Sequence, residues 1–349
     1  MSSDLPDHRL TSPEFVSDYP TIRLVRLKDE LLFWIVLLNL VPEFLSILAS
    51  EDHLSTYQQY LDRHSSLLQA YWRNYVIDPD SPHAGEVIAT SLAADRQDLH
   101  ALLSEVDLVR LAEDAIARAE DAFQVDRPVD VVLMVGVGGA NAGELVVGGK
   151  GIAFVCVEHF TGRVNPSSFG MGLSPGLIPV WIAHEIAHCV RYTSPTSESE
   201  LRRLVTEQNG YYDFWATGSR ATLRELLVNE GVAVHASQAV APGYAPPDYF
   251  GYPRRQYARM RELESFLRRS VKDELDQAGL GFRLRYLMGG ATAATRLVQG
   301  KVLPERSGYY LGHRMTEALV QSVGIPKALR ASAEVFAEAE KEALGIRSA

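Results

Sequence analysis

Two histidines and one glutamate near the middle of the chain have residue types and a spacing that could support catalysis. His184, Glu185 and His188 form the pattern His-Glu-x-x-His. Histidines four residues apart lie one turn above each other on the same face of an α-helix, so one metal ion can bind both. The glutamate beside them could accept a proton from a water molecule. The pattern therefore predicts a metal site with a general base, typical of zinc hydrolases.

The surrounding residues predict a buried helix over about residues 177–192. Pro175-Gly176 and Pro179 suit a helix start, and Ser194-Pro195 forces a stop. Apart from the three ionisable residues, the run 180–190 is apolar or Cys on all sides, which indicates burial. Burying three ionisable side chains is costly unless something pairs with them, and a metal ion would do so. The alternative is a chance match with two hydrogen-bonded core histidines.

A second predicted helix, over residues 222–241, offers a further metal ligand. It opens on the capping box Thr222-Leu223-Arg224-Glu225. Glu230 falls within the apolar stripe of this helix, where an acidic residue needs a partner. That partner could be a metal ion shared with the two histidines, or a buried Arg. His235 turns to another face and is the weaker ligand candidate.

Composition and charge narrow the classes of function. The chain has 349 residues, 46% of them hydrophobic, and 34 Lys+Arg against 44 Asp+Glu give a net charge of −10. No block of basic residues interrupts this acidic balance, which argues against a nucleic acid or an anionic membrane surface as partner. The glycine-rich loop 136–141 is followed by strand residues instead of a helix, so nucleotide binding is not predicted.

The cysteine count and the N-terminal residues favour a cytoplasmic protein. Cys156 and Cys189 are too few for a disulfide framework. Residues 1–19 have acidic residues and a Pro where a signal peptide needs a basic start and an apolar core. The apolar run 31–41 is much shorter than the roughly 20 residues of a membrane span, so no transmembrane segment is expected. We predict that this run forms a buried helix.

The hydrophobic pattern predicts an α+β, mostly helical protein with two regions. Residues 1–125 should form a helical N-terminal region. Residues 126–349 should begin with a small mixed or antiparallel sheet over 129–158, with the predicted helices after it and a helical C-terminal part over 254–349. We expect the sheet to pack beside the His-Glu-x-x-His helix, with one strand at the edge of a cleft, where it could pair with an extended substrate.

Three motifs together resemble known metallopeptidases. His-Glu-x-x-His followed by Asn229-Glu230-Gly231-Val232-Ala233 resembles the gluzincins, whose third zinc ligand is a Glu on a following helix. With Tyr309-Tyr310-Leu311-Gly312-His313, the chain most resembles an uncharacterised group of predicted zinc-dependent bacterial proteases. The resemblance covers about residues 129–320 and implies a zincin-like fold for 126–349. It also implies a zinc cofactor on His184, His188 and Glu230, and a peptide or protein substrate.

The chain also departs from the known patterns. Forty-one residues separate His188 from Glu230, which is longer than the typical gluzincin spacing. The Gly-x-Met-Glu-Asn loop of aminopeptidases is absent, so aminopeptidase activity is not implied. Arg191 and Ser194 stand where a metzincin needs its Gly and third His.

Three protein ligands would leave a fourth zinc position for water, which distinguishes a catalytic zinc site from a structural one. Glu185 would take the proton of that water, and one more donor would stabilise the oxyanion. Tyr310 is the first candidate donor and His313 the second, because the resemblance places this segment at the cleft, and Tyr309 stays open as the donor. The alternative is a Tyr-His pair that only packs a helix. Two other functions stay open: a helical binding or scaffold protein with a structural or degenerate metal site, and a zinc hydrolase of non-peptide substrates.

Overall fold

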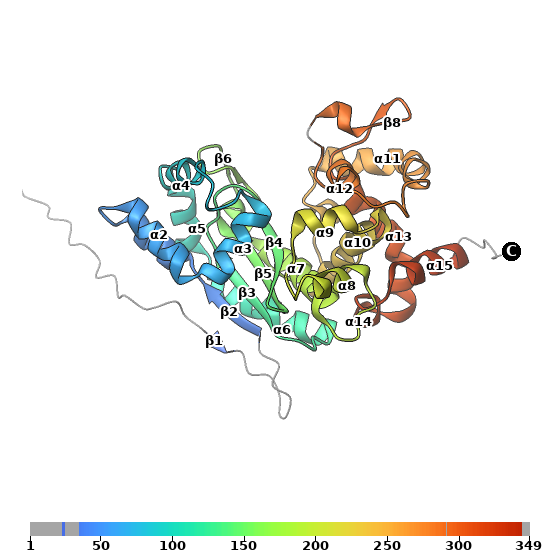
Figure 1. Cartoon of the computed structure of the whole chain (residues 1–349), viewed down its shortest axis with the longest axis horizontal. Coiled ribbons are helices and arrows are strands. Elements are labelled where there is room, and N and C mark those ends of the chain that lie inside the picture. Colours follow the sequence, from blue (N-terminus) through green and yellow to red (C-terminus); the bar gives the residue numbers. More distant parts are fainter. Residues whose placement is uncertain (1–22, 25–34, 291, 344–349) are drawn as a thin grey trace, which may run out of the picture.

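The chain folds as a mostly helical α+β protein around one small mixed sheet, as the sequence predicts (Figure 1). The computed structural model describes residues 23–24, 35–290 and 292–343. Helices cover the sheet and continue into a helical C-terminal lobe. Among the helices of these described residues, none combines the length and the apolar character needed to cross a membrane.

The five-stranded sheet has the order β1-β2-β3-β5-β4. Its strands are β1 (Arg23–Leu24), β2 (Ile35–Asn39), β3 (Val129–Met134), β4 (Ala142–Val147) and β5 (Lys150–Cys156). Strands β2 and β5 run parallel to β3, and the outer strands are antiparallel to their neighbours. Gly148 and Gly149 have φ angles of 59° and 78° and form the tight turn predicted between β4 and β5. Two short hairpins complete the strands: β6 (Val164–Asn165) with β7 (Gly170–Met171), and β8 (Leu297–Val298) with β9 (Lys301–Val302).

The prediction of a helix over residues 31–41 is wrong where the structure describes that run. Residues 31–34 lie outside the described residues, and Ile35–Asn39 form β2, with Ile35 opposite Val129 of β3. A short apolar run fits a buried strand and a buried helix equally well, because both faces are apolar in either case. Pairing with β3 decides the outcome.

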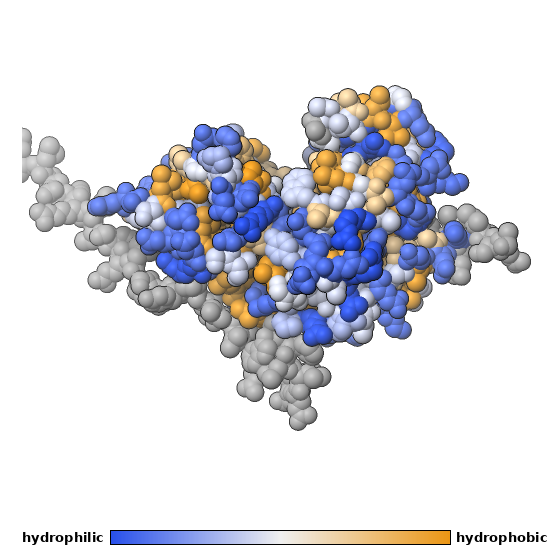
Figure 2. Space-filling model, in the orientation of Figure 1, coloured by the Kyte–Doolittle hydropathy of each residue, from blue (hydrophilic) through white to orange (hydrophobic). Residues whose placement is uncertain are grey.

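Helices before and after the sheet build the rest of the molecule. Before β3 they are α1 (Val41–Leu48), α2 (His53–Arg63), α3 (Ser65–Tyr75), α4 (Ala84–Leu92), α5 (Gln97–Glu105) and α6 (Leu108–Phe123). After β5 they are η1 (Val157–Phe160), η2 (Pro175–Leu177), α7 (Ile178–Thr193), α8 (Glu200–Glu207), α9 (Phe214–Arg220), α10 (Leu223–Val240), η3 (Pro246–Phe250), α11 (Arg254–Val271), α12 (Leu280–Leu287), η4 (Ala293–Arg296), α13 (Ser307–Val323), α14 (Ile325–Ala328) and α15 (Ala333–Ala343). The face drawn in Figure 2 is largely hydrophilic and is hollowed between the end of the sheet near β6 and the lobe with α11 and β8.

Helix α7 is the buried centre of this arrangement. It packs against β4 and β5, as predicted, and also against α6 and α10. A buried ion pair fastens it to α10, with Arg191 Nη2 2.6 Å from Glu225 Oε1. The same guanidinium donates to the carbonyls of Leu329 and Ala331. Because breaking a buried pair leaves an uncompensated charge, this contact strongly constrains how the two helices meet.

Helices α10 and α13 cross with their backbones in contact at two glycines. A Cβ atom on Gly312 would lie 1.9 Å from the carbonyl oxygen of Leu227. One on Gly231 would lie 2.2 Å from the carbonyl group of Gly312. Neither neighbour can move aside, because both are helix backbone. The crossing therefore requires glycine at both positions, which belong to the two motifs that follow His-Glu-x-x-His in the sequence.

Replacing Gly312 by Ala should destabilise the protein by at least about 1 to 3 kcal/mol, because the added methyl group forces two backbones apart. Gly85→Ala in α4 is the matched control, since its Cβ would meet nothing within 4 Å. That change should be neutral or stabilising by up to about 1 kcal/mol. Urea unfolding measures both free energies of unfolding. Equal values for the two variants would show that the α10–α13 contact is looser than described.

Candidate functional site

Two helices bring His184, His188 and Glu230 together inside the protein. Helix α7 supplies both imidazoles and α10 supplies the carboxylate. Glu230 Oε2 lies 3.3 Å from His184 Nε2 and 3.5 Å from His188 Nε2. The imidazole rings are 4.7 Å apart between centroids. The exposed fractions of the three residues are 2%, 2% and 8%, so the cluster is screened from bulk water.

These three residues could hold a zinc ion. Imidazole nitrogen and carboxylate oxygen are ligands that zinc takes, and one ligand atom from each side chain lies within 4.8 Å of the others. The two Nε2 atoms turn towards the same carboxylate oxygen, so the three donors converge. The Nδ1 atoms of both histidines lack a hydrogen-bond partner among the described residues, whereas many zinc sites provide one there. The three donors suit a zinc ion, but the histidines lack the hydrogen bonds that commonly orient zinc ligands.

The charges of the cluster are strongly coupled. Burial would raise the pKa of Glu230, but His188 and His184 hold it well below its usual range. Burial would also lower the pKa of His188, but the carboxylates of Glu230 and Glu144 raise it to about 9. Glu230 is therefore ionised over the physiological pH range and is available as an anionic ligand.

Glu185 differs from Glu230 in its surroundings, because no histidine or other described residue donates a hydrogen bond to it. It is 3% exposed and accepts no hydrogen bond from the described residues. Its carboxylate lies in a second close group with His188 and Glu144, with atoms within 4.8 Å of one another. Burial, and then the charges of Glu144 and Glu230, raise the pKa of Glu185 well above its usual value. A buried carboxylate without partners is costly, and such groups cluster at functional sites.

A tyrosine network holds Glu144 beside this carboxylate. Tyr192 donates to Glu144 Oε1 at 2.9 Å and accepts from Asn229 at 3.0 Å, and Tyr75 lies 3.0 Å from Glu144 Oε2. The ring of Tyr192 also stacks on His188. Sequence reasoning missed both Glu144 and Tyr192. Two signals were present: Tyr192 follows His188 by one helical turn, and Glu144 interrupts an apolar strand.

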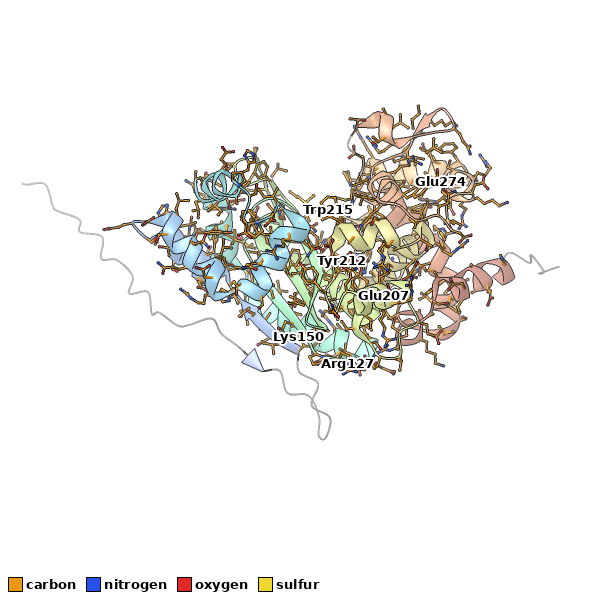
Figure 3. The ribbon with its side chains drawn as sticks, viewed as in Figure 1. Arg127, Lys150, Glu207, Tyr212, Trp215 and Glu274 are labelled. Atoms are coloured by element: carbon orange, nitrogen blue, oxygen red, sulfur yellow. The ribbon has the colours of Figure 1, made fainter. Side chains whose placement is uncertain are left out.

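Strand β4 is the edge strand nearest α7, but it does not offer a free edge for substrate at its centre. The Tyr75 hydroxyl accepts from the amide of Glu144 and lies 2.9 Å from its carbonyl oxygen. The amide of Tyr212 donates to the carbonyl of Val146. Tyr212 accordingly lies between the sheet and the helices beside it (Figure 3). The expectation that an edge strand pairs with extended substrate is wrong at these two residues, because the chain itself uses their outward groups.

Comparison with known proteins adds one finding. Residues 211–338 match a family described as Predicted Zn-dependent protease (DUF2268). That stretch includes Glu230 and the segment 309–313, and it begins after α7 and its two histidines. Curated proteins and solved structures gave no match. The similarity to a group of predicted zinc proteases therefore covers the C-terminal part of the chain, and α7 brings His184 and His188 to it.

The structure does not bring Tyr310 or His313 to the cluster. Tyr310 donates to Glu264 Oε2 at 2.6 Å, and its ring packs near Phe250. The ring of His313 stacks on His235, 4.0 Å away, and its Nε2 lies 3.3 Å from Gln238. His235 in turn bonds to the backbone carbonyl of His313, so it is not a fourth ligand. These contacts correct the expected placement, because the face of α13 that carries Tyr310 and His313 turns towards α11 and the end of α10.

Tyr309 occupies the place expected for Tyr310. Its ring stacks on that of His184 with centroids 6.2 Å apart, and Trp181 lies 5.3 Å from the same imidazole. Burial, and then the charge of Glu230, raise the pKa of Tyr309, so its hydroxyl remains a hydrogen-bond donor. The sequence placed Tyr309 and Tyr310 one residue apart on a helix, and only the packing of α13 shows which of them faces α7.

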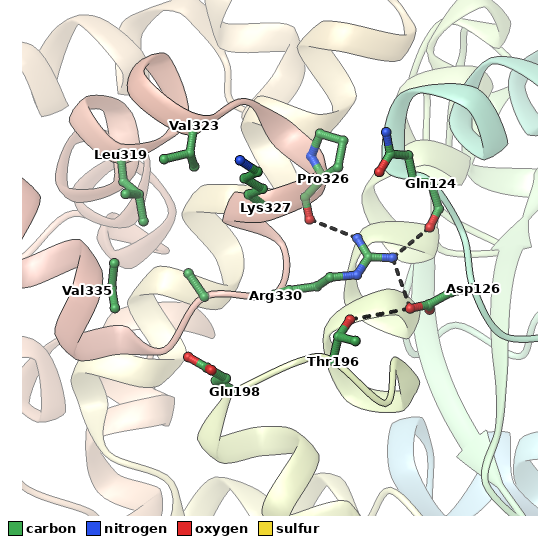
Figure 4. Close-up of a pocket in the computed structure, with 11 residues that line it drawn as sticks. Gln124, Asp126, Thr196, Glu198, Leu319, Val323, Pro326, Lys327, Arg330 and Val335 are labelled. Carbon is green, nitrogen blue, oxygen red and sulfur yellow. Dashed lines mark hydrogen bonds and ion pairs between the residues drawn. The ribbon is translucent and has the colours of Figure 1, made fainter.

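A separate hollow of about 620 Å³ lies where the C-terminal ends of α6 and α7 meet α14 (Figure 4). Arg330 crosses it and bonds to the carbonyls of Phe123, Gln124 and Pro326 and to the carboxylate of Asp126. Arg330, the charged group at its centre, is therefore already engaged, and no His or Cys of the described residues lines the hollow. This hollow is a gap between packed helices, and the described residues that line it include no group of metal-ligating side chains such as the one around Glu185.

Proposed function

We propose that the protein is a zinc-dependent peptidase in which His184, His188 and Glu230 hold the ion and Glu185 is the general base. One observation supports this most directly: two imidazoles and a carboxylate converge in the interior, next to a second carboxylate that accepts no hydrogen bond from the described residues. The match of residues 211–338 to predicted zinc proteases supports the same class of activity.

Each residue of the site would have a separate role in hydrolysis. A bound zinc ion would polarise a substrate carbonyl and bring the pKa of a water molecule to about 7. Glu185 would take the proton of the attacking water and pass it to the leaving amine, because its carboxylate is adjacent and free to accept. Its buried position favours proton uptake. We assign stabilisation of the oxyanion to Tyr309, whose ring lies against His184.

If these three residues are the ligands, the protein should bind about one zinc ion per chain, and a change at Glu230 should lower its affinity for zinc. Glu230→Ala should weaken zinc binding by more than the roughly 10- to 100-fold that loss of an outer-shell contact costs, since a charged ligand is removed. Glu262→Gln is the control, because Glu262 is exposed and pairs with Arg259 on the same helix. Elemental analysis and competition with a chelator measure content and affinity. Unaltered affinity in Glu230→Ala would reject Glu230 as a ligand.

Glu185→Gln should keep the zinc and the fold but lose hydrolysis by about 10²- to 10⁴-fold, because an amide of the same size cannot accept the proton. Rates are measured on a fluorogenic peptide selected by a library screen with the unmodified protein. Unfolding midpoint and zinc content serve as controls. A wild-type rate in this variant would contradict the peptidase mechanism. Bound zinc without any cleaved peptide would favour a hydrolase of other substrates, and no bound zinc would favour a scaffold.

Tyr309→Phe and Tyr310→Phe form a matched pair on one helical turn. Tyr309→Phe should retain zinc and lower turnover by about 10²- to 10³-fold, the usual cost of one oxyanion donor. Tyr310→Phe should change turnover little and destabilise the fold by about 1.5 to 3 kcal/mol, because it removes a hydrogen bond to the Glu264 carboxylate. Steady-state kinetics and urea unfolding separate the two effects. The reverse pattern would return the catalytic role to Tyr310.

A further inference from the structure

Arg306 places a permanent positive charge next to the proposed metal centre. Its guanidinium lies over the ring of Tyr309, 4.4 Å from the centroid, and that ring stacks on His184. A Cβ atom on Gly251 would lie 3.6 Å from Arg306 Nη1 and 3.0 Å from the ring of Trp181. Arg306, Tyr309 and Trp181 therefore form one wall beside the first histidine of the cluster.

This guanidinium has no carboxylate partner in the part of the chain that the structure describes. Two other buried or half-buried arginines pair with carboxylates, Arg191 with Glu225 and Arg314 with Glu264. Arg283 and Arg96 bond to hydroxyls and backbone carbonyls instead. Arg306 is half-buried: its guanidinium lies beside the rings of Tyr252 and Tyr309 and interacts with the Tyr309 hydroxyl. Burial would lower the pKa of Arg306, but these two tyrosines and the charge of Glu230 raise it, although Arg306 and Glu230 form no ion pair. A planar fork of N–H donors held against an aromatic ring is suited to bidentate binding of a carboxylate.

The backbone holds Arg306 in a conformation that side chains seldom adopt. Its φ and ψ are 55° and 28°, in the left-handed region, directly before the first residue of α13. Its carbonyl accepts hydrogen bonds from the Tyr252 hydroxyl and the Tyr309 amide. Such strain costs on the order of 1 kcal/mol or more and persists where surrounding contacts enforce it, often at ligand sites. This conformation occurs directly before the helix that carries Tyr309, over whose ring the guanidinium lies.

We propose that Arg306 binds a carboxylate of the substrate, an inference that rests on the proposed peptidase function. Two carboxylates of the chain, Glu230 in the cluster and Glu144 beside His188, would repel an anionic substrate group. Arg306 offsets that repulsion from the α13 side. It acts in substrate binding, since its guanidinium lies over the ring of Tyr309 and forms no ion pair with Glu185 or Glu230. The bound group is either the C-terminal carboxylate of a peptide or an acidic side chain.

The test uses four versions of a cleaved fluorogenic peptide from the library screen. One pair has a free or an amidated C-terminus, and the other has Asp or Asn next to the scissile bond. Values of kcat/KM are measured for the unmodified protein, Arg306→Gln and Arg306→Lys. The dissociation constants of the same peptides are measured on zinc-loaded Glu185→Gln with and without Arg306→Gln. Arg259→Gln on the exposed face of α11 is the control, since Arg259 pairs only with Glu262.

In one of the two pairs, the unmodified protein should prefer the peptide with the carboxylate over its neutral partner. The preference should be about 10- to 100-fold in both affinity and kcat/KM, the size expected of a charge-assisted hydrogen bond. Arg306→Gln should bring kcat/KM and affinity for the carboxylate peptide down to those of its neutral partner in the same variant, and Arg306→Lys should retain part of the preference. A preference in the first pair identifies a C-terminal carboxylate, and one in the second identifies an acidic side chain. Arg259→Gln should preserve the preference in full.

Two results would overturn the inference while leaving the peptidase function intact. One is cleavage of all four peptides with no carboxylate preference. The other is a loss in Arg306→Gln that is equal for all four, which would place the guanidinium at the reacting carbonyl. If the unmodified protein cleaves no peptide, the proposed function fails, and this inference fails with it. Zinc content and unfolding midpoints establish that each variant is folded. If Arg306→Gln does not fold, the carboxylate preference of Arg306→Lys is compared with that of the unmodified protein.

Discussion

The contact between the backbones of α10 and α13 at Gly231 and Gly312 is the constraint on which the site depends. Glu230 directly precedes the first of these glycines, and Tyr309 lies three residues before the second. Once the two helices touch at this point, both side chains are directed at α7, where the histidines lie. A larger residue at either glycine would force α10 and α13 apart, so this contact constrains the two helices that carry Glu230 and Tyr309.

Helix α7 carries several ionisable side chains in the interior, and they differ in whether a group of opposite charge pairs with them. Arg191 is matched by Glu225, and the two histidines share Glu230. Only Glu185 of this helix stays without a hydrogen bond among the described residues, in a place where desolvation disfavours its charge. A buried carboxylate that accepts no hydrogen bond from the described residues keeps its oxygens free for a proton or a water molecule.

The tyrosines around β4 influence where a substrate can approach. Tyr75 and Tyr212 use the outward backbone groups of the edge strand, and Tyr75 and Tyr192 hold the carboxylate of Glu144. The centre of the sheet edge is thus occupied by the protein itself. The α13 side differs, because Tyr309 lies there beside His184, with the guanidinium of Arg306 over its ring. Arg306 forms no ion pair with a carboxylate of the described residues, so this side can accept an anionic group.

The sequence by itself determined what depends on local periodicity. It placed His184 and His188 on one helical face, the β4–β5 hairpin on a pair of glycines, and Glu230 on the apolar stripe of a later helix, because helix and strand periods are set by neighbouring residues. Tertiary structure decided the rest. Residues 35–39 became a strand only because β3 lies beside them, and Glu144 reached Glu185 only because β4 packs on α7. The choice between Tyr309 and Tyr310 depended on the rotation of α13 about its own axis. That rotation is set by the contact of Gly312 with α10, a long-range packing constraint that no local pattern encodes.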